Sequence, residues 1–369
     1  MFDHEIRRIA INTGGGDAPG LNAVIRASVL AALGEGWECF GIRDGYNGIL
    51  RPDAYDEGGV VSLGPRDVRG ITHLGGTILG TTNRGDPIAY PVQRPDGTWE
   101  KIDRSEELVR KIEEAGIDAV IAVGGDGSMR IAKRLADHGL PVVGVPKTID
   151  NDLEETSVTF GFDTAVTFGT ECIDRLHTTA EAHERLMVVE VMGRYAGWIA
   201  LHAGLAGSAD AILIPEIPYD LERVAEKIRM REAQGQHFSI VVVAEGAHPK
   251  GGERSVIEAS SDHSERLGGI GHRVAGELAA MTGKETRTVV LGHLLRGGSP
   301  TTRDRILSLR FGAAAVRAIK DRCFGCMVAL DPPDVRYVPL EKVTGRMKLV
   351  PIDSDTVRTV RALGVSLGD

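Results

Sequence analysis

Two short segments of this 369-residue chain combine glycine, carboxylate and hydroxyl groups in a spacing that suits phosphate chemistry. Gly124–Ser128 reads Gly-Gly-Asp-Gly-Ser, and Pro146–Asp152 reads Pro-Lys-Thr-Ile-Asp-Asn-Asp. Glycine lets phosphate oxygens approach the backbone, carboxylates bind a metal ion, and a further carboxylate can take the proton of a hydroxyl group. Together these groups predict phosphoryl transfer to an alcohol, a reaction that depends mainly on positioning and electrostatic stabilisation.

The sequence around both segments favours a ligand site. The first follows the strand-like run 119–123 and precedes a helix-like run, and the second follows the strand-like run 142–145. Parallel α/β sheets bind ligands beyond the carboxyl ends of their strands, and helix N-termini attract anions. The alternative interpretations are a plain strand-to-helix turn with Ser128 near the N-cap, and an Asx-rich turn at 150–152. Two such turns with complementary chemistry favour the functional interpretation.

Strand-like and helix-like runs alternate along most of the chain. Residues 9–12 lead into the glycine-rich run 13–20, which a predicted helix from about Leu21 to Leu33 follows; further strand-like runs cover 187–192, 211–214, 240–244 and 288–291. This alternation predicts right-handed βαβ units, mainly parallel sheets, and function at the loops after the strands. Residues 91–100 differ, because their Pro-Asp-Gly turn predicts a hairpin inserted beside the first domain.

Composition limits the class of protein. The length is typical of about two domains, and the 47 glycines and 5% aromatic content are typical of an α/β enzyme. The net charge is −9 and the basic residues are scattered, so we expect no nucleic-acid partner. We expect no membrane span and no signal peptide, and hence a cytoplasmic protein. Cys323 and Cys326 form a lone C-x-x-C without a second pair, which favours packed thiols over a metal or redox site.

The ordered set of motifs resembles the phosphofructokinase family whose members use ATP or pyrophosphate, over nearly the whole chain up to about Leu330. The resemblance implies an α/β fold of two Rossmann-like three-layer domains with mainly parallel sheets. We expect a donor-phosphate domain at 1–161 plus about 295–345, a fructose-6-phosphate domain at 162–294, and a C-terminal tail at 346–369. The resemblance also implies a glycolytic transferase that forms homodimers or homotetramers with active sites at subunit contacts.

Residue roles on the donor side follow from the same resemblance. The implied reaction moves a phosphoryl group to the 1-hydroxyl of fructose 6-phosphate, with Asp150 as the base and Thr148 as a substrate contact. Asp126 and Asp152 match positions at the metal, so Mg²⁺ is the expected cofactor. The donor site is nucleotide-binding where ATP is the donor. Its matching positions are Gly16, Arg84, Gly125, Asp126, Gly127 and Ser128.

The expected sugar-phosphate site uses later motifs. The resemblance places Arg194 near the transferred group, Glu216 on sugar hydroxyls, and Arg185 and Arg287 on the 6-phosphate from the neighbouring subunit. Arginine suits these positions because its guanidinium binds phosphate in a bidentate manner. The full set of substrate-binding positions is Thr148, Asp150, Arg185, Met192, Gly193, Arg194, Glu216, Arg287, His293 and Arg296.

Two positions depart from the pattern of bacterial ATP-using members. Asn83 stands where those members have a donor-phosphate arginine, and Arg84 follows one position later, so Arg84 replaces it only if the loop shifts. Leu295 stands where glutamine is usual before Arg296. The first departure affects the donor side, and the second removes an amide from the acceptor side.

The identity of the donor depends on Gly127 and Lys147. Pyrophosphate-using members usually have Asp and Lys at these positions, and bacterial ATP-using members usually have Gly at both, so this chain is mixed. Gly127 leaves room for a nucleotide, whereas Lys147 neutralises phosphate charge with either donor. We therefore expect ATP first and pyrophosphate as the alternative. A non-catalytic regulatory subunit is a further alternative, although Asp126 and Asp150 are both retained, and NAD or lipid kinases do not account for the later motifs.

Overall fold

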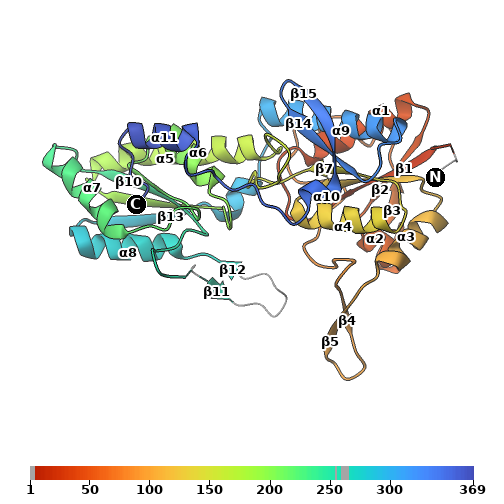
Figure 1. Cartoon of the computed structure of the whole chain (residues 1–369), viewed down its shortest axis with the longest axis horizontal. Helices are drawn as coiled ribbons and strands as arrows, with labels where there is room; N and C mark the ends of the chain where they lie inside the picture. Colours follow the sequence, from red (N-terminus) through yellow and green to blue (C-terminus); the bar gives the residue numbers. More distant parts are fainter. Residues whose placement is uncertain (1–4, 254–255, 259–265) are drawn as a thin grey trace. The chain divides into compact units, whose positions relative to one another are not determined.

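The computed structural model describes residues 5–253, 256–258 and 266–369, and they form two compact units (Figure 1). Unit 1 comprises the chain up to Thr148 together with Leu153–Gly161 and Arg296–Met347. Unit 2 comprises Ile149–Asp152, Phe162–Leu295 and Lys348–Asp369. The domain boundaries expected from the sequence stay predictions; the division into units places 149–152 and 348–369 with unit 2.

Unit 1 contains a seven-stranded sheet in the order β15-β14-β7-β6-β1-β2-β3. The five inner strands pair in parallel, and the two edge strands, β15 and β3, pair antiparallel to their neighbours. The mainly parallel α/β fold predicted from the alternating pattern is therefore confirmed. The strands are β1 Arg8–Thr13, β2 Glu38–Ile42, β3 Val60–Ser62, β6 Ala119–Gly124, β7 Val142–Pro146, β14 Cys326–Asp331 and β15 Asp334–Pro339.

Helices cover both faces of this sheet because its inner strands are apolar on both sides. In β1, Ile9 and Ile11 point into the core beneath α1 and α9, and Ala10 points into the opposite core beneath α3 and α4. Two-sided burial of this kind makes the three-layer sandwich stable. The helical segments are α1 Leu21–Gly34, α2 Asn47–Leu50, η1 Pro52–Ala54, α3 Ser105–Glu114, α4 Asp126–Asp137, α9 Thr302–Lys320 and α10 Leu340–Val343.

A hairpin extends from unit 1, as Figure 1 shows. Its strands, β4 Tyr90–Gln93 and β5 Trp99–Ile102, pair antiparallel. Gly97 at the turn has φ +85°, which glycine adopts without strain, and the Asp96 carboxylate accepts a hydrogen bond from the Thr98 N–H (2.9 Å). The hairpin predicted from the Pro-Asp-Gly turn is confirmed.

Unit 2 contains a four-stranded parallel sheet in the order β13-β8-β10-β9. Helices α5 and α6 contact one face, and α7 and α8 pack against the other around Val188, Val241 and Val243. Figure 1 shows the layers. The elements are α5 Phe162–Ala182, β8 Leu186–Val191, α6 Trp198–Ala206, β9 Ala211–Leu213, α7 Leu221–Ala233, β10 Ser239–Ala244, β11 Val256–Glu258, β12 Arg266–Leu267, α8 Ile270–Thr282, β13 Thr286–Val290 and α11 Asp355–Ala362, with η2 Gly292–Arg296 following β13.

The two cysteines of the C-x-x-C pack in the core of unit 1. Cys326 is buried in that core, and Cys323 is half-buried against it. The Cys326 thiol donates to the Cys323 carbonyl oxygen (2.9 Å), and burial raises the pKa of Cys326 to about 12.

None of the helices in the described ranges has the length and apolar character needed to cross a bilayer.

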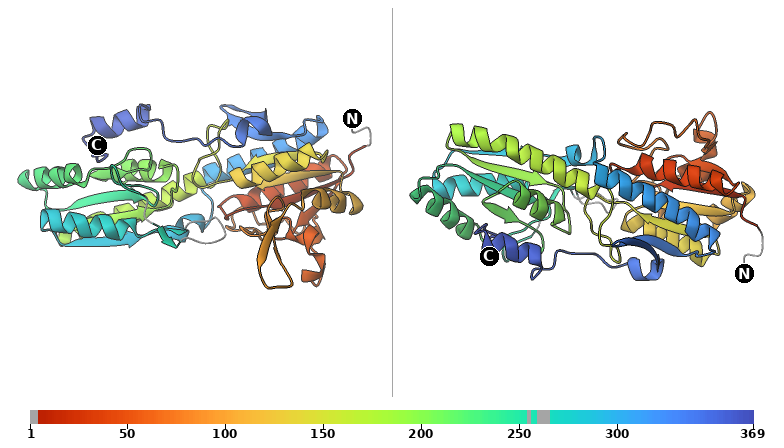
Figure 2. Two further views of the ribbon diagram at one scale, coloured as in Figure 1. Left: turned by 60° about the horizontal axis from the view of Figure 1, so that its bottom comes forward. Right: turned by 90° about the horizontal axis from the view of Figure 1, so that it is seen from above.

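A close contact between α1 and α9 generates a stability prediction. These helices lie side by side in unit 1 (Figure 2), and a Cβ atom on Gly312 of α9 would lie only 2.6 Å from the Val24 carbonyl oxygen. We expect Gly312→Ala to lower the free energy of unfolding by about 1–3 kcal/mol through overpacking, despite the higher helix propensity of alanine. Urea denaturation measures the change.

The matched control lies in α1 itself. A Cβ on Gly34, the last residue of that helix, would have no heavy atom within 4 Å. Gly34→Ala should therefore be neutral or stabilise by up to about 1 kcal/mol. A Gly312→Ala protein that is as stable as the parent would contradict the prediction.

Candidate active site

Three loops of unit 1 meet at one edge of its sheet. They follow β1, β6 and β7, which are neighbours whose pairing brings Thr13 beside Val123 and Gly124 beside Pro146. The Gly14 N–H donates to the Val123 carbonyl oxygen (2.9 Å), and the Lys147 N–H donates to that of Gly124 (2.9 Å). The two segments predicted to carry the phosphate chemistry therefore lie side by side, next to the first glycine-rich loop.

Glycine is required where these loops approach each other. A Cβ atom would lie 2.7 Å from the Ser128 hydroxyl oxygen at Gly14 and 2.0 Å from it at Gly124. Helix α4 starts directly beyond, with Gly125 at the N-cap and no side-chain cap. An uncapped helix N-terminus with adjacent glycine backbone is a site for an anion such as phosphate.

Asp126, the first residue of α4, has chemistry that fits a metal ion. Its Oδ1 atom is buried and makes no hydrogen bond, and burial raises the pKa of this carboxyl, although the charge of Arg130 and the N–H of Gly345 lower it. A carboxylate oxygen without a partner fits Mg²⁺, which prefers oxygen ligands. Within the described ranges, no group of three or more His, Cys, Asp or Glu side chains could hold a metal. Donor phosphate oxygens would have to supply further ligands.

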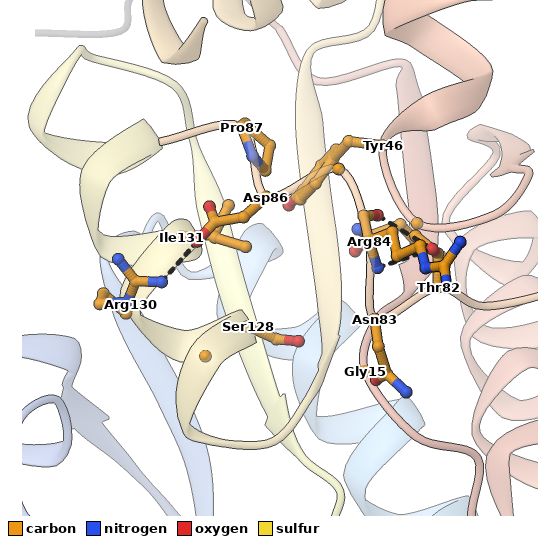
Figure 3. A pocket seen from close by; sticks show the side chains of 15 residues that line it. Gly15, Tyr46, Thr82, Asn83, Arg84, Asp86, Pro87, Ser128, Arg130 and Ile131 are labelled. Carbon is orange, nitrogen blue, oxygen red and sulfur yellow. Dashed lines mark hydrogen bonds and ion pairs between the residues drawn. The ribbon is translucent and has the colours of Figure 1, made fainter. Parts of the chain in front are cut away.

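A pocket of about 210 Å³ opens beside these loops (Figure 3). Asn83 and Arg84 both line it, together with Gly127 and Ser128. A Cβ on Gly127 would meet no heavy atom within 4 Å, which means that this position faces open space.

The pocket also contains aromatic and charged side chains that no motif in the sequence indicated, among them Tyr46, Asp86 and Arg130. Tyr46 is buried there, and Arg130 forms an ion pair with Asp86 (2.5 Å), as the dashed line in Figure 3 shows. Arg130 lies one helical turn after Asp126, a spacing that could have signalled it. Tyr46 and Asp86 come from separate loops, and no local pattern in the sequence connects them to the glycine motif.

Two basic side chains lie against the first glycine loop. Lys147 is only 3% exposed, and its ammonium donates to the Gly16 carbonyl oxygen. Arg296, expected at the acceptor, lies beside the same glycine: a Cβ on Gly16 would be 2.8 Å from Arg296 Nη1. The Arg296 guanidinium also donates to the Asp17 carbonyl oxygen (3.4 Å). Unit 1 therefore brings two cations to the loop predicted to bind donor phosphates.

In unit 2, the predicted acceptor residues follow the carboxyl ends of parallel strands. Met192, Gly193 and Arg194 follow β8, Glu216 follows β9, and His293 follows β13. Gly193 has φ +139°, and its carbonyl oxygen accepts from the Gly246 N–H (3.1 Å), which fixes the loop after β8 to the loop after β10. Parallel pairing thus gathers three predicted segments at one sheet edge.

The loop around Glu216 is well ordered by hydrogen bonds. Its carboxylate accepts from the Gly197 N–H (3.0 and 3.1 Å to its two oxygens) and from the Val350 N–H (2.8 Å). His293 is exposed, whereas Leu295 is only 1% exposed. The leucine that replaces the usual glutamine is therefore part of the interior of unit 2.

Arg185 and Arg287 lie away from that edge. Arg185 immediately precedes β8, and Arg287 lies near the start of β13, where it pairs with Met187. Both guanidiniums contact the Glu285 carboxylate, at 2.9 Å for Arg185. The structure brings the two arginines together, but at the opposite end of the strands from Met192 and Glu216.

The Thr148–Asp152 segment spans both units. Thr148 belongs to unit 1, where its carbonyl oxygen accepts from the Thr159 hydroxyl (2.7 Å). Asp150 and Asp152 belong to unit 2 and are half-buried. Asn151 between them is 4% exposed and has φ +52°, a left-handed conformation that is uncommon outside glycine.

Comparisons with known proteins agree with this arrangement. The family profile described as Phosphofructokinase matches residues 8–319. The chain is 54% identical to an ATP-dependent 6-phosphofructokinase of Chloroflexus aurantiacus, over 98% of both chains. It is 50% identical to a pyrophosphate–fructose 6-phosphate 1-phosphotransferase of Amycolatopsis mediterranei, over 94% of this chain and 97% of the relative.

A solved structure is also similar. Phosphofructokinase from Saccharomyces cerevisiae superposes with a TM-score of 0.75 at 30% identity, over 91% of this chain and 45% of the yeast chain. The yeast protein is therefore more than twice the length matched here. The profile match, the identity to full-length relatives and the shared fold lead to one conclusion: the chain belongs to the phosphofructokinase family.

Proposed function

We propose that this protein is an ATP-dependent 6-phosphofructokinase, a kinase that transfers the γ-phosphoryl group of ATP to the 1-hydroxyl of fructose 6-phosphate in glycolysis. The observation that supports it most is the donor side of unit 1, where glycine loops and the uncapped N-terminus of α4 line one pocket. Asp126, the first residue of α4, carries a buried oxygen without a partner. Relatives at 54% identity carry the same name. Fructose 1,6-bisphosphate is the expected product.

In the proposed mechanism, the Asp150 carboxylate accepts the proton of the 1-hydroxyl as its oxygen attacks the γ-phosphorus, and ADP leaves. Arg194 stabilises the charge that develops on the transferred group, and Glu216 binds sugar hydroxyls. The fixed Glu216 carboxylate supports this assignment, because a held acceptor orients the sugar with little loss of entropy.

Asp126 would hold Mg²⁺ together with donor phosphate oxygens. Asp152 stays the second metal position that the resemblance implies. When bound, Mg²⁺ supplies positive charge that neutralises those oxygens. Ser128, Lys147 and the N-terminus of α4 contribute hydrogen bonds and positive charge to the same phosphates.

Pyrophosphate is the second candidate donor, and one observation favours it. A relative named pyrophosphate–fructose 6-phosphate 1-phosphotransferase is 50% identical to this chain, close to the 54% of the ATP-dependent relative, and the buried Lys147 suits either donor. Initial rates with fructose 6-phosphate and Mg²⁺, measured with each donor in turn, decide between the two. Higher kcat/KM with pyrophosphate would overturn the ATP assignment.

We also propose a homodimer or homotetramer. Arg185 and Arg287 lie at the end of the unit 2 strands away from Glu216, which fits a role in the active site of a neighbouring subunit. The cytoplasmic location expected from the sequence stays a prediction. Light scattering on the purified protein measures the oligomer, and a monomer with full activity would contradict this proposal.

We predict that Asp150→Asn keeps the fold but lowers kcat by at least about 10²-fold, because the amide keeps the shape of the side chain and cannot take the proton. The KM for fructose 6-phosphate should change little. Steady-state kinetics and thermal unfolding measure the two effects. Turnover within a few-fold of the parent would show that Asp150 is not the base.

Asp126→Asn should raise thermal stability while it impairs function. Because burial raises the pKa of Asp126 in the folded state, its ionised form destabilises the fold above that pKa, and the cost disappears as the pH falls toward the ordinary pKa. The variant should melt at a higher temperature than the parent at neutral pH without metal, and this advantage should shrink in acid. Its Mg²⁺ requirement should rise by at least about tenfold.

Calorimetry in a chelator at several pH values and Mg²⁺ titrations of the rate test the two parts of the Asp126 prediction. A lower melting temperature for Asp126→Asn at neutral pH would contradict the first part. An unchanged Mg²⁺ dependence would contradict the second.

Gly127→Asp should discriminate between donors. The position faces open space at the start of α4, where a carboxylate is compatible with the helix, so the fold should tolerate the change. The new charge would repel the nucleotide phosphates, and we expect kcat/KM for ATP to fall at least about tenfold more than that for pyrophosphate. Gly127→Ala is the uncharged control. Lys147→Gly should lower kcat/KM for pyrophosphate more than kcat/KM for ATP. Equal losses with both donors would contradict this interpretation.

A further inference from the structure

The chain ends in a segment, Lys348–Asp369, that packs entirely within unit 2 and that we call the C-terminal strap. Its far end joins the edge of the sheet: Ser366 accepts from the Ile212 N–H (2.8 Å) and donates to the Asp210 carbonyl oxygen (3.0 Å). Val357 and Val360 of α11 are fully buried. Figure 2 shows the strap in dark blue beside the green and yellow elements of unit 2.

The near end of the strap contacts the loop that carries Asp150. The Lys348 N–H donates to the Asp152 carbonyl oxygen (2.9 Å), and the Lys348 ammonium donates to Asn151 Oδ1 (3.0 Å). One residue therefore holds both of the residues that follow the proposed base, through its backbone and through its side chain.

This loop needs external support. Asn151 adopts a left-handed conformation with φ +52°, which costs a non-glycine residue about 1 kcal/mol or more unless the surroundings enforce it. Asp150 and Asp152 lie on either side, so two carboxylates flank the strained residue. A cation at Asn151 both supplies a strong donor to its amide oxygen and offsets the repulsion between the carboxylates.

Lys348 is itself held from the other side. Its carbonyl oxygen accepts from the Trp198 indole N–H (2.8 Å), and its ammonium lies 5.7 Å from the centre of the indole ring, a cation–π distance. Two residues later, the Val350 N–H donates to Glu216 (2.8 Å). The same few residues of the strap therefore contact the loop of the proposed base and the carboxylate proposed to bind the sugar.

We propose that Lys348 is a positioning residue for phosphoryl transfer, which it supports by fixing Asn151 and thereby the direction of the Asp150 carboxylate. This inference rests on the proposed function of Asp150 and extends it to a residue outside every motif identified in the sequence. Small errors in the placement of a catalytic group reduce turnover while leaving substrate binding largely intact.

Lys348→Met tests this role because it keeps an unbranched apolar stem of similar length and removes the ammonium. We expect kcat to fall by about tenfold or more while the KM values for both substrates stay within about threefold of the parent. Lys348→Arg, which restores a charged donor, should recover part of the loss. Lys342→Met, at an exposed lysine of α10, is the matched control and should leave kcat unchanged.

Hydrogen–deuterium exchange of the peptide covering 147–154 gives a readout that does not depend on the reaction. Faster exchange of this peptide in Lys348→Met than in Lys342→Met supports the proposal, and unchanged exchange overturns it. This readout applies even if the parent protein has no kinase activity and the proposed function is wrong. With an active parent, an unchanged kcat in Lys348→Met overturns the proposal. The proposal is also overturned if the loss of turnover in Lys348→Met is explained by the fraction of unfolded protein and Lys348→Arg does not restore activity.

Discussion

Parallel hydrogen bonding makes β1, β6 and β7 end at the same edge of the unit 1 sheet, and the chemistry of that unit depends on this constraint. Each loop that follows lies beside the next, so groups distant in sequence become neighbours. Lys147 reaches the Gly16 carbonyl oxygen across 131 residues of sequence. The same rule operates in unit 2, where parallel strands bring the loops that carry Gly193 and Glu216 to one edge.

The donor side carries a buried carboxylate whose charge is unfavourable without a metal ion. Lys147 is nearly fully buried, and Asp126 has a buried oxygen that makes no hydrogen bond. Burial of the Asp126 carboxylate costs free energy that a metal ion would recover. Sites that sacrifice stability in this way are more often functional than structural, because structural positions are free to change to residues of lower cost. The buried carboxylate and the glycine loops therefore both indicate a ligand site at this edge of the unit 1 sheet.

Local patterns were enough to predict the strands that precede the candidate loops, the helix at Leu21 and the hairpin, because each depends on periodicity or turn chemistry within a few residues. They did not predict β2 or the edge strands β3 and β15. The glycine and aspartate motifs likewise indicated where the loops lie, although the individual roles of their residues stay predictions. The position of Arg296 beside Gly16, and the pocket side chains Tyr46 and Asp86, could not be predicted. These contacts join segments with no shared periodicity, and only the packing of whole elements creates them.

The contact of Lys348 is the hardest of these to predict from the sequence, since its ammonium donates to Asn151 across 197 residues. Lys348 is the first residue of unit 2 after Met347, just as Ile149 is the first after Thr148, so two segments that enter unit 2 are hydrogen-bonded to each other. The backbone bond to Asp152 would survive any substitution except proline, whereas the bond to Asn151 needs a long cationic side chain. Because Val350 of the strap also donates to Glu216, one short segment contacts both the loop of Asp150 and the carboxylate proposed to bind the sugar. The backbone of the strap sets the separation of these two contacts, and the Lys348 side chain then fixes Asn151 and the direction of the Asp150 carboxylate.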